Sequence, residues 1–114
     1  MELSKRNKKV AREVIDKGLQ IEFSNGLNKA AEIIENWKKN NQSNREAYHA
    51  LYAAIYDFDK HIAHRYDGMT GSRYIPIVLE QLSDGIISED DLKNFSPEVY
   101  QEIVEIKKRW EEYE

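Results

Sequence analysis

Residues 43–67, SNREAYHALYAAIYDFDKHIAHRYD, decide the fold of this chain because they read as one well-signalled helix. Ser43 and Glu46 form a capping box, in which each side chain can satisfy a backbone N–H at the start of a helix. Apolar side chains then recur every three or four residues and therefore share one side of the helix: Tyr48, Leu51, Tyr52, Ile55, Phe58, Ile62 and Tyr66. Alanines flank this stripe and let another helix approach closely, so we expect residues 43–67 to be the most buried element.

A second apolar stripe precedes this helix and predicts another long helix over residues 4–39. The stripe keeps helical phase along its whole length: Ala11, Ile15, Leu19, Phe23, Leu27, Ala30, Ile34 and Trp37. Gly18 and Gly26 interrupt the segment, and an interior glycine destabilises a helix by about 1 kcal/mol relative to alanine. The preserved phase favours one continuous helix, with a kink at Gly18 or at residues 24–26 as the alternative. The polar run KKNNQS, residues 38–43, then predicts a short connection.

The rest of the chain predicts shorter helices. Gly68 can end the second helix, Thr70 or Ser72 can cap a third that begins near Tyr74, and Gly85 can stop it. Residues 88–92 predict a brief helical turn, and residues 96–98, Ser-Pro-Glu, begin a last helix with proline at its first position. No stretch alternates with period two. We therefore predict an all-α fold, a compact helical bundle of about four main helices plus one short helical turn, in a single domain over residues 1–114.

The distribution of charge predicts how two of these helices pair. The formal net charge is -4, with basic residues at the start of the chain and acidic residues at its end: Lys5, Arg6, Lys8, Lys9 and Arg12 against Glu98, Glu102, Glu105, Glu111, Glu112 and Glu114. Attraction between these groups predicts that the first and last helices lie antiparallel. Nucleic acid is not an expected partner, because nonspecific binding to a polyanion depends on positive charge.

Composition limits the location and the chemistry of the chain. The sequence has no cysteine, which excludes disulfides and thiolate catalysis. No apolar run approaches the roughly 18 residues of a membrane span. The start of the chain also has no apolar segment behind its charges of the kind that a signal peptide carries. We therefore expect a cytoplasmic protein with no membrane partner.

Asp57, His61 and His64 form the first candidate site. They lie at i, i+4 and i+7, which places them on one side of a helix, and imidazole with carboxylate is a ligand set for zinc or another divalent metal. A further ligand would have to come from another helix; the candidates are Glu32, Glu35 and Glu80. The alternative is a polar strip in which Asp57 contacts His61 and no metal binds. We predict no cofactor, with a divalent metal as the alternative.

The segment HRYDGMTGSRY, residues 64–74, forms the second candidate site. Arg65 and Arg73 bracket Thr70, Gly71 and Ser72 just before a predicted helix, whose free N–H groups could receive a phosphate or a carboxylate. The segment lacks the Walker pattern, because no lysine follows its second glycine. The alternative is a helix-ending glycine followed by a cap and two exposed arginines.

The sequence favours a binding role over catalysis. No motif links the histidines to a serine, threonine or lysine nucleophile. Tyrosine and tryptophan are more numerous on the helix faces than a small core can hide, and both are favoured in interfaces: Trp37, Tyr48, Tyr52, Tyr56, Tyr66 and Tyr74. We therefore predict a protein-interaction or regulatory module that self-associates as a two-fold dimer. The alternative is a metal- or anion-binding protein, or an enzyme, that uses the two candidate sites.

Overall fold

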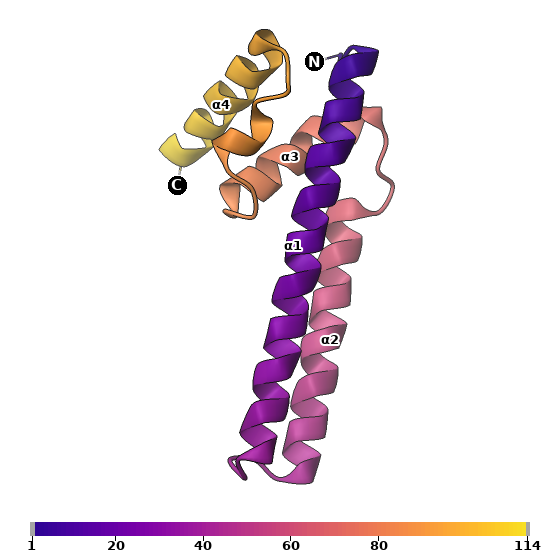
Figure 1. Cartoon of the computed structure of the whole chain (residues 1–114), viewed down its shortest axis with the longest axis vertical. Coiled ribbons are helices and arrows are strands. Elements are labelled where there is room, and N and C mark those ends of the chain that lie inside the picture. Colours follow the sequence, from indigo (N-terminus) through magenta and orange to yellow (C-terminus); the bar gives the residue numbers. More distant parts are fainter. Residues whose placement is uncertain (1, 114) are drawn as a thin grey trace. The chain divides into compact units, whose positions relative to one another are not determined.

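The computed structural model describes residues 2–113 and consists of helices joined by short turns (Figure 1). The α-helices and 3₁₀ turns follow one another in this order: α1 (Lys5–Lys38), α2 (Asn44–Tyr66), η1 (Gly71–Arg73), α3 (Tyr74–Ser83), η2 (Glu89–Leu92) and α4 (Pro97–Glu112). No strand occurs in this part of the chain. The predicted all-α fold of four main helices is confirmed, and η2 is the predicted short turn.

α1 is one helix of 34 residues, so the favoured prediction of a continuous helix is confirmed and neither glycine marks a break. Both glycines instead lie where another element approaches closely. A Cβ atom at Gly18 would lie 2.6 Å from Cδ of Gln81, and one at Gly26 would lie 3.0 Å from the ring of Phe58. A residue with a side chain would have to displace these neighbours, which is why glycine suits both positions despite its low helix propensity.

The contacts divide the chain into two units, residues 1–20 with 68–114, and residues 21–67. The first unit has an apolar core, to which α3 contributes five apolar residues beside the buried Gln81, and residues 3–15 of the chain contribute five more. Two polar contacts fasten this core: Nε2 of Gln81 donates to the carbonyl oxygen of Ile15 at 3.0 Å, and Nδ2 of Asn7 donates to Oγ of Ser96 at 3.2 Å. The prediction of a single domain over residues 1–114 stays a prediction.

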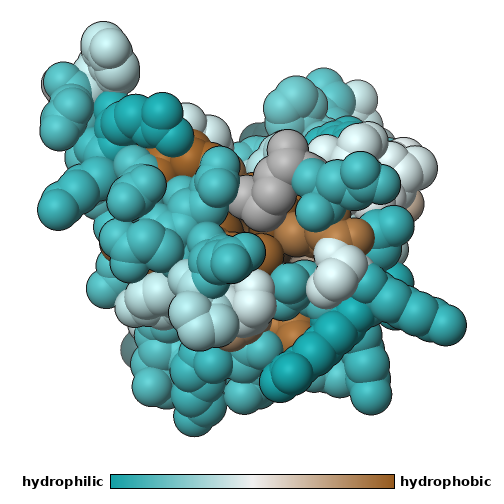
Figure 2. Space-filling view, turned by 90° about the horizontal axis from the view of Figure 1, so that it is seen from above, coloured by the Kyte–Doolittle hydropathy of each residue, from teal (hydrophilic) through white to brown (hydrophobic). Residues whose placement is uncertain are grey.

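The surface seen in Figure 2 is mainly hydrophilic, and hydrophobic residues are visible there only between hydrophilic ones. This pattern is the usual one for helices that bury one side and expose the other. No helix within residues 2–113 is long and apolar enough to cross a membrane.

The second unit is a hairpin in which α2 runs beside the last part of α1 (Figure 1). Ser43 caps α2 as predicted, because its Oγ accepts from the backbone N–H of Glu46 at 3.1 Å. The connection includes Asn40 in the left-handed conformation with φ 62°, which asparagine tolerates better than most residues. Few side chains of this unit are buried: Glu22, Ala47, Arg65 and Tyr66.

The prediction that residues 43–67 form the most buried element is therefore wrong. α2 has three buried residues out of 23, whereas α3 has six out of ten. The reason is that the hairpin gives the apolar side of α2 one neighbouring helix, α1, which covers only part of it.

The antiparallel pairing of the first and last helices is not confirmed. The hydrogen bonds that join them connect Asn7, in the first turn of α1, to Ser96, the residue that caps α4. The two helices thus touch near their beginnings, and the predicted pairing of the basic start with the acidic end stays a prediction.

Candidate functional site

Large apolar side chains are exposed along both helices of the hairpin. Those that share one side of it are Phe23 (41% exposed), Leu27 (72%) and Ile34 (38%) on α1, and Tyr48 (71%), Tyr52 (64%) and Ile55 (49%) on α2. We call these six side chains the apolar face. A hydrophobic side chain exposed singly is ordinary, but six on one surface are not.

The spacing of these residues explains why they share a side. An α-helix turns by about 100° per residue, so the three on α1 fall within about 40° of arc and the three on α2 within about 60°. The two sets also meet across the hairpin. Ile34 and Tyr48 line one open groove, while Leu27 and Ile55 line another.

The first groove lies near the turn between the helices and measures about 310 Å³. Its lining is almost entirely apolar: Ile33, Ile34, Trp37, Ala47, Tyr48 and Leu51, with Asn44 at its edge. The indole Nε1 of Trp37 donates to Oδ1 of Asn44 at 2.7 Å, which orients the ring across the start of α2. The indole is therefore held in place and forms one wall of this groove.

The second groove is wider, at about 800 Å³, and follows the middle of the hairpin. Phe23 and Phe58 line it with their ring centroids 5.9 Å apart, within the range of a favourable aromatic pair. Asp57 and His61 also line it. The lining of the groove thus combines apolar and polar side chains.

The tyrosines of α2 are ordered by their own neighbours. The rings of Tyr52 and Tyr56 stack at 6.2 Å with an interplanar angle of 14°, and Nζ of Lys60 lies 4.6 Å from the centroid of the Tyr56 ring. Stacking and the cation–π contact restrict these side chains before any partner binds. Pre-ordered aromatic rings lose little conformational entropy when a partner covers them.

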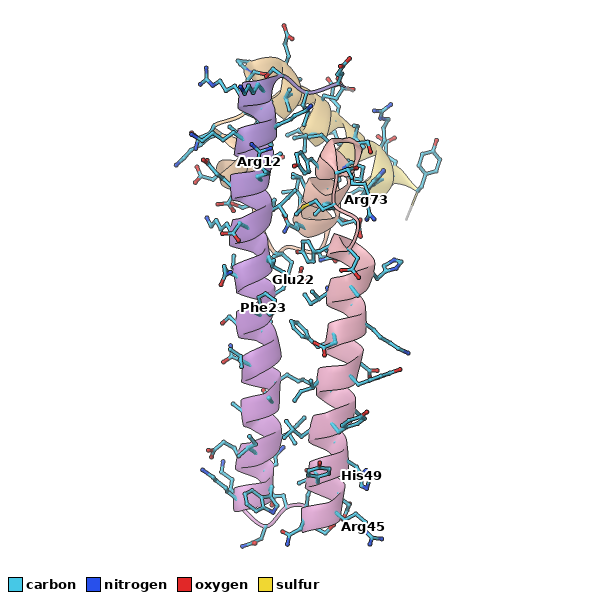
Figure 3. The ribbon with its side chains drawn as sticks, turned by 90° about the vertical axis from the view of Figure 1, so that its right-hand side faces the viewer. Arg12, Glu22, Phe23, Arg45, His49 and Arg73 are labelled. Atoms are coloured by element: carbon cyan, nitrogen blue, oxygen red, sulfur yellow. The ribbon has the colours of Figure 1, made fainter. Side chains whose placement is uncertain are left out.

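A buried carboxylate, that of Glu22, lies where α1 meets the last turns of α2. We call Glu22 and its three partners, His61, Arg65 and Tyr66, the Glu22 cluster. Glu22 is 4% exposed and reaches from α1 toward α2 (Figure 3). Its Oε1 contacts Nε2 of His61 at 2.6 Å and accepts from a guanidinium nitrogen of Arg65 at 3.0 Å, while Oε2 accepts from the hydroxyl of Tyr66. A buried charge needs such partners, since an unpaired one is strongly destabilising.

The sequence analysis did not identify Glu22. The signal that could have found it is position: Glu22 lies four residues from both Gly18 and Gly26, on the side of α1 that packs closely. A glutamate on that side must either break the packing or find a partner. The partners follow one another on α2 at i, i+4 and i+5.

The structure gives the residues of the predicted metal site different surroundings. His61 contacts Glu22, Asp57 is exposed and lines the wider groove, and His64 is exposed on α2. Within residues 2–113, no group of three or more histidine, aspartate or glutamate side chains is arranged to hold a metal ion. The metal site at Asp57, His61 and His64 stays a prediction.

The residues of the predicted anion site belong to both units, Arg65 to residues 21–67 and the others to the unit that begins again at residue 68. Arg65 is buried and bonded to Glu22, so the alternative with two exposed arginines is wrong for Arg65. Thr70, Gly71 and Ser72 are exposed and lie at η1, where Oγ1 of Thr70 and Oγ of Ser72 are 3.1 Å apart. Neither hydroxyl makes a capping hydrogen bond: Thr70 precedes η1 without one, and α3 continues directly from η1 at Arg73. Anion binding by Thr70, Gly71, Ser72 and Arg73 stays a prediction.

Comparisons with known proteins add no relative from which a role could be transferred. Neither a protein family, nor a curated protein, nor a solved structure matches this chain.

Proposed function

We propose that the chain is a protein-interaction module and that the apolar face of its hairpin is the surface that binds a partner. The observation that carries this proposal is the exposure of that face, above all of Leu27 at 72% and Tyr48 at 71%. Its composition also fits, since tyrosine and aromatic side chains are enriched in interfaces. A cytoplasmic location is part of the proposal.

The extent of the face supports this role. Aromatic side chains bury about 150–250 Å² each, so the exposed fractions of the apolar face, with Trp37 (40%) and Tyr56 (50%) beside it, leave roughly 800 Å² of side-chain surface in water. The largest apolar patch of a typical monomer measures about 300–600 Å². One partner of a standard protein–protein interface buries about 800 Å².

The Glu22 cluster has a structural part in this proposal. A general acid or base must reach the proton that it transfers, whereas Glu22 is buried and both of its oxygens are engaged by side chains of α2. These bonds join α1 to the end of α2. We propose that they hold the two helices at the spacing that keeps the apolar face continuous.

The proposal is tested by a photoreactive amino acid placed at single positions of the chain in the cells that produce it. A photoreactive phenylalanine analogue at Tyr52 should form one discrete protein adduct on irradiation. The matched control is the same analogue at Glu32, an exposed position on the side of α1 opposite to the apolar face. Equal or absent adducts at the two positions would overturn the proposal.

A further inference from the structure

We propose that the partner of the apolar face is a second copy of this chain, and that the two hairpins meet antiparallel around a two-fold axis at the level of Tyr52. The inference rests on the proposed function and names the partner of that same surface. Two hairpins joined in this way form a four-helix bundle, in which each apolar face covers the other.

The spacing of exposed residues on α2 is that of a helix that pairs with another helix. Arg45, Tyr48, Tyr52, Ile55 and Asp59 follow one another at steps of three and four, the a and d positions of two heptads, and all five are exposed. At about 100° per residue they fall within about 80° of arc. A seam of this kind packs against a second helix at a small crossing angle.

The charges at the ends of this seam select the antiparallel orientation. Arg45 lies seven residues before Tyr52, and Asp59 lies seven residues after it. When a helix pairs antiparallel with its own copy around Tyr52, Arg45 meets Asp59 of the partner subunit on both sides of the axis. A parallel pairing would bring arginine to arginine and aspartate to aspartate, which is unfavourable.

Neither of these two charges takes part in an ion pair within the described residues. Arg45 projects from the first turn of α2 (Figure 3). No ion pair within residues 2–113 includes Arg45 or Asp59, whereas Glu22 of the hairpin is paired with His61 and Arg65. Both are thus available to a second copy.

The same two-fold axis also gives favourable contacts between α1 and its copy. Gly26 lies against Phe58 and Glu22 against His61, so the part of α1 level with Tyr52 is close to residue 32. An antiparallel pairing of α1 with its copy around that level brings Leu27 to Trp37 of the partner subunit. The most exposed large apolar side chain of α1 thus meets an aromatic ring that is 40% exposed. One position of the two-fold axis therefore gives complementary contacts on both helices, Arg45 to Asp59 on α2 and Leu27 to Trp37 on α1.

The opposed surfaces are large enough for a stable pair. The apolar face together with Trp37 and Tyr56 exposes roughly 800 Å² on each copy, which matches the area that one partner of a standard interface buries. Dimers of this size derive most of their stability from the apolar centre, while charges at the rim determine orientation.

Disulfide trapping tests the axis, because the chain has no cysteine of its own. Tyr52→Cys should form a disulfide-linked dimer under mild oxidation at least tenfold faster than Glu32→Cys, whose position faces away from the partner. Arg45→Cys and Asp59→Cys should each crosslink slowly alone and readily when mixed. Equal rates for Tyr52→Cys and Glu32→Cys would overturn the inference, as would efficient crosslinking of Arg45→Cys with itself.

Charge reversal tests the orientation without an oxidant. Arg45→Asp should weaken dimerisation about tenfold, since each reversal acts twice in a two-fold pair; Asp59→Arg should do the same. The double variant restores opposite charges and should return to within about threefold of the original dissociation constant. A double variant as weak as the single ones would overturn the inference.

These outcomes separate the inference from the proposed function. If the photoreactive analogue at Tyr52 forms an adduct with a different protein while the purified chain stays monomeric, the interaction module stands and self-pairing is wrong. If neither an adduct nor a dimer forms, both fail.

Discussion

Glu22 is a carboxylate held almost entirely away from water, and its surroundings explain how the hairpin tolerates it. Removing an ion from water is unfavourable by several kcal/mol, and attraction to a buried counter-ion offsets this only when further hydrogen bonds are made. Arg65 supplies the charge, and His61 and Tyr66 supply the additional contacts. The cluster adds little net stability as a whole, but losing the carboxylate removes the partner that His61, Arg65 and Tyr66 share.

Substituting Glu22 should therefore destabilise the protein strongly. Glu22→Gln keeps the shape but leaves the buried guanidinium of Arg65 without its carboxylate, so the free energy of unfolding should fall by roughly 3 kcal/mol. Urea denaturation measures this change. Glu35→Gln, an exposed position on the same helix, should change it by less than about 0.5 kcal/mol. Equal effects of the two substitutions would show that Glu22 has no such role.

Asp91 should contribute stability that depends on pH. Its hydrogen bond with Lys17 and its bond from the backbone N–H of Ser88 hold the pKa of its carboxyl below the ordinary value of 3.8. A carboxyl whose pKa is lowered by folding stabilises the protein above its unfolded pKa and loses that contribution as pH falls. Asp91→Asn should thus lower the free energy of unfolding by roughly 1 kcal/mol at pH 7.

The difference between Asp91→Asn and the original chain should shrink as pH falls below about 3.8. Urea denaturation over a pH series measures both quantities. A difference that stays constant, or grows as the solution becomes more acidic, would contradict the assigned role of the carboxylate.

At the scale of single residues, sequence reasoning found the features that act locally. Ser43 caps α2 and Ser96 caps α4, because a cap depends on residues three positions away. Sequence reasoning did not identify Glu22, because its partners lie about 40 residues later in the chain. The hydroxyls of Thr70 and Ser72 looked like caps but are not, since η1 continues into α3 without a break.

α1 shows what periodicity can and cannot establish at the scale of an element. The apolar stripe kept its phase across both glycines and thereby predicted one helix, which is correct. The glycines themselves looked like weak points because their low propensity is visible in the sequence and their packing is not. Gln81 and Phe58, which occupy the space a side chain would fill, lie 63 and 32 residues further along the chain.

Gly18→Ala should destabilise the protein although alanine is the better helix former. The gain in propensity is about 1 kcal/mol, but the new methyl group would push the buried Gln81 side chain from its bond with the carbonyl of Ile15. Overpacking and the lost hydrogen bond together should outweigh the gain, lowering the free energy of unfolding by roughly 1–3 kcal/mol.

Thermal or urea denaturation measures the effect of Gly18→Ala. The matched control is Ser24→Ala, an exposed position of the same helix where alanine should stabilise by a few tenths of a kcal/mol. If Gly18→Ala also stabilised the protein, the close approach of Gln81 to α1 would be wrong.

α2 shows that an apolar stripe does not reveal whether its side chains are buried in the single chain. Its apolar stripe predicts which side of the helix needs cover, yet Tyr48, Tyr52 and Ile55 of that stripe are exposed. An apolar stripe indicates that one side of a helix is unfavourable in water, but it does not indicate which element or molecule packs against that side. The expected burial of α2 was wrong for the single chain, and the inferred dimer would supply the missing cover.

At the scale of the whole molecule, the two units differ in how much of their apolar surface is buried. The unit built around α3 encloses its core, with Ile15, Ile77 and Ile103 almost fully buried, whereas the hairpin leaves its apolar face in water. The sequence predicted the helices and the excess of aromatic residues but not this division. The antiparallel pairing that the charges at the two ends of the chain predict for the first and last helices stays a prediction, since exposed charges interact only weakly in water.

The central claim is that a second copy covers the apolar face, and the mass of the purified chain in solution tests it most directly. Sedimentation equilibrium at micromolar concentration should give twice the 13.4 kDa of one chain. Leu27→Lys with Tyr52→Lys should give the mass of one chain, whereas Glu32→Lys should leave the doubled mass unchanged. A mass of 13.4 kDa for the original chain throughout the micromolar range would contradict the account.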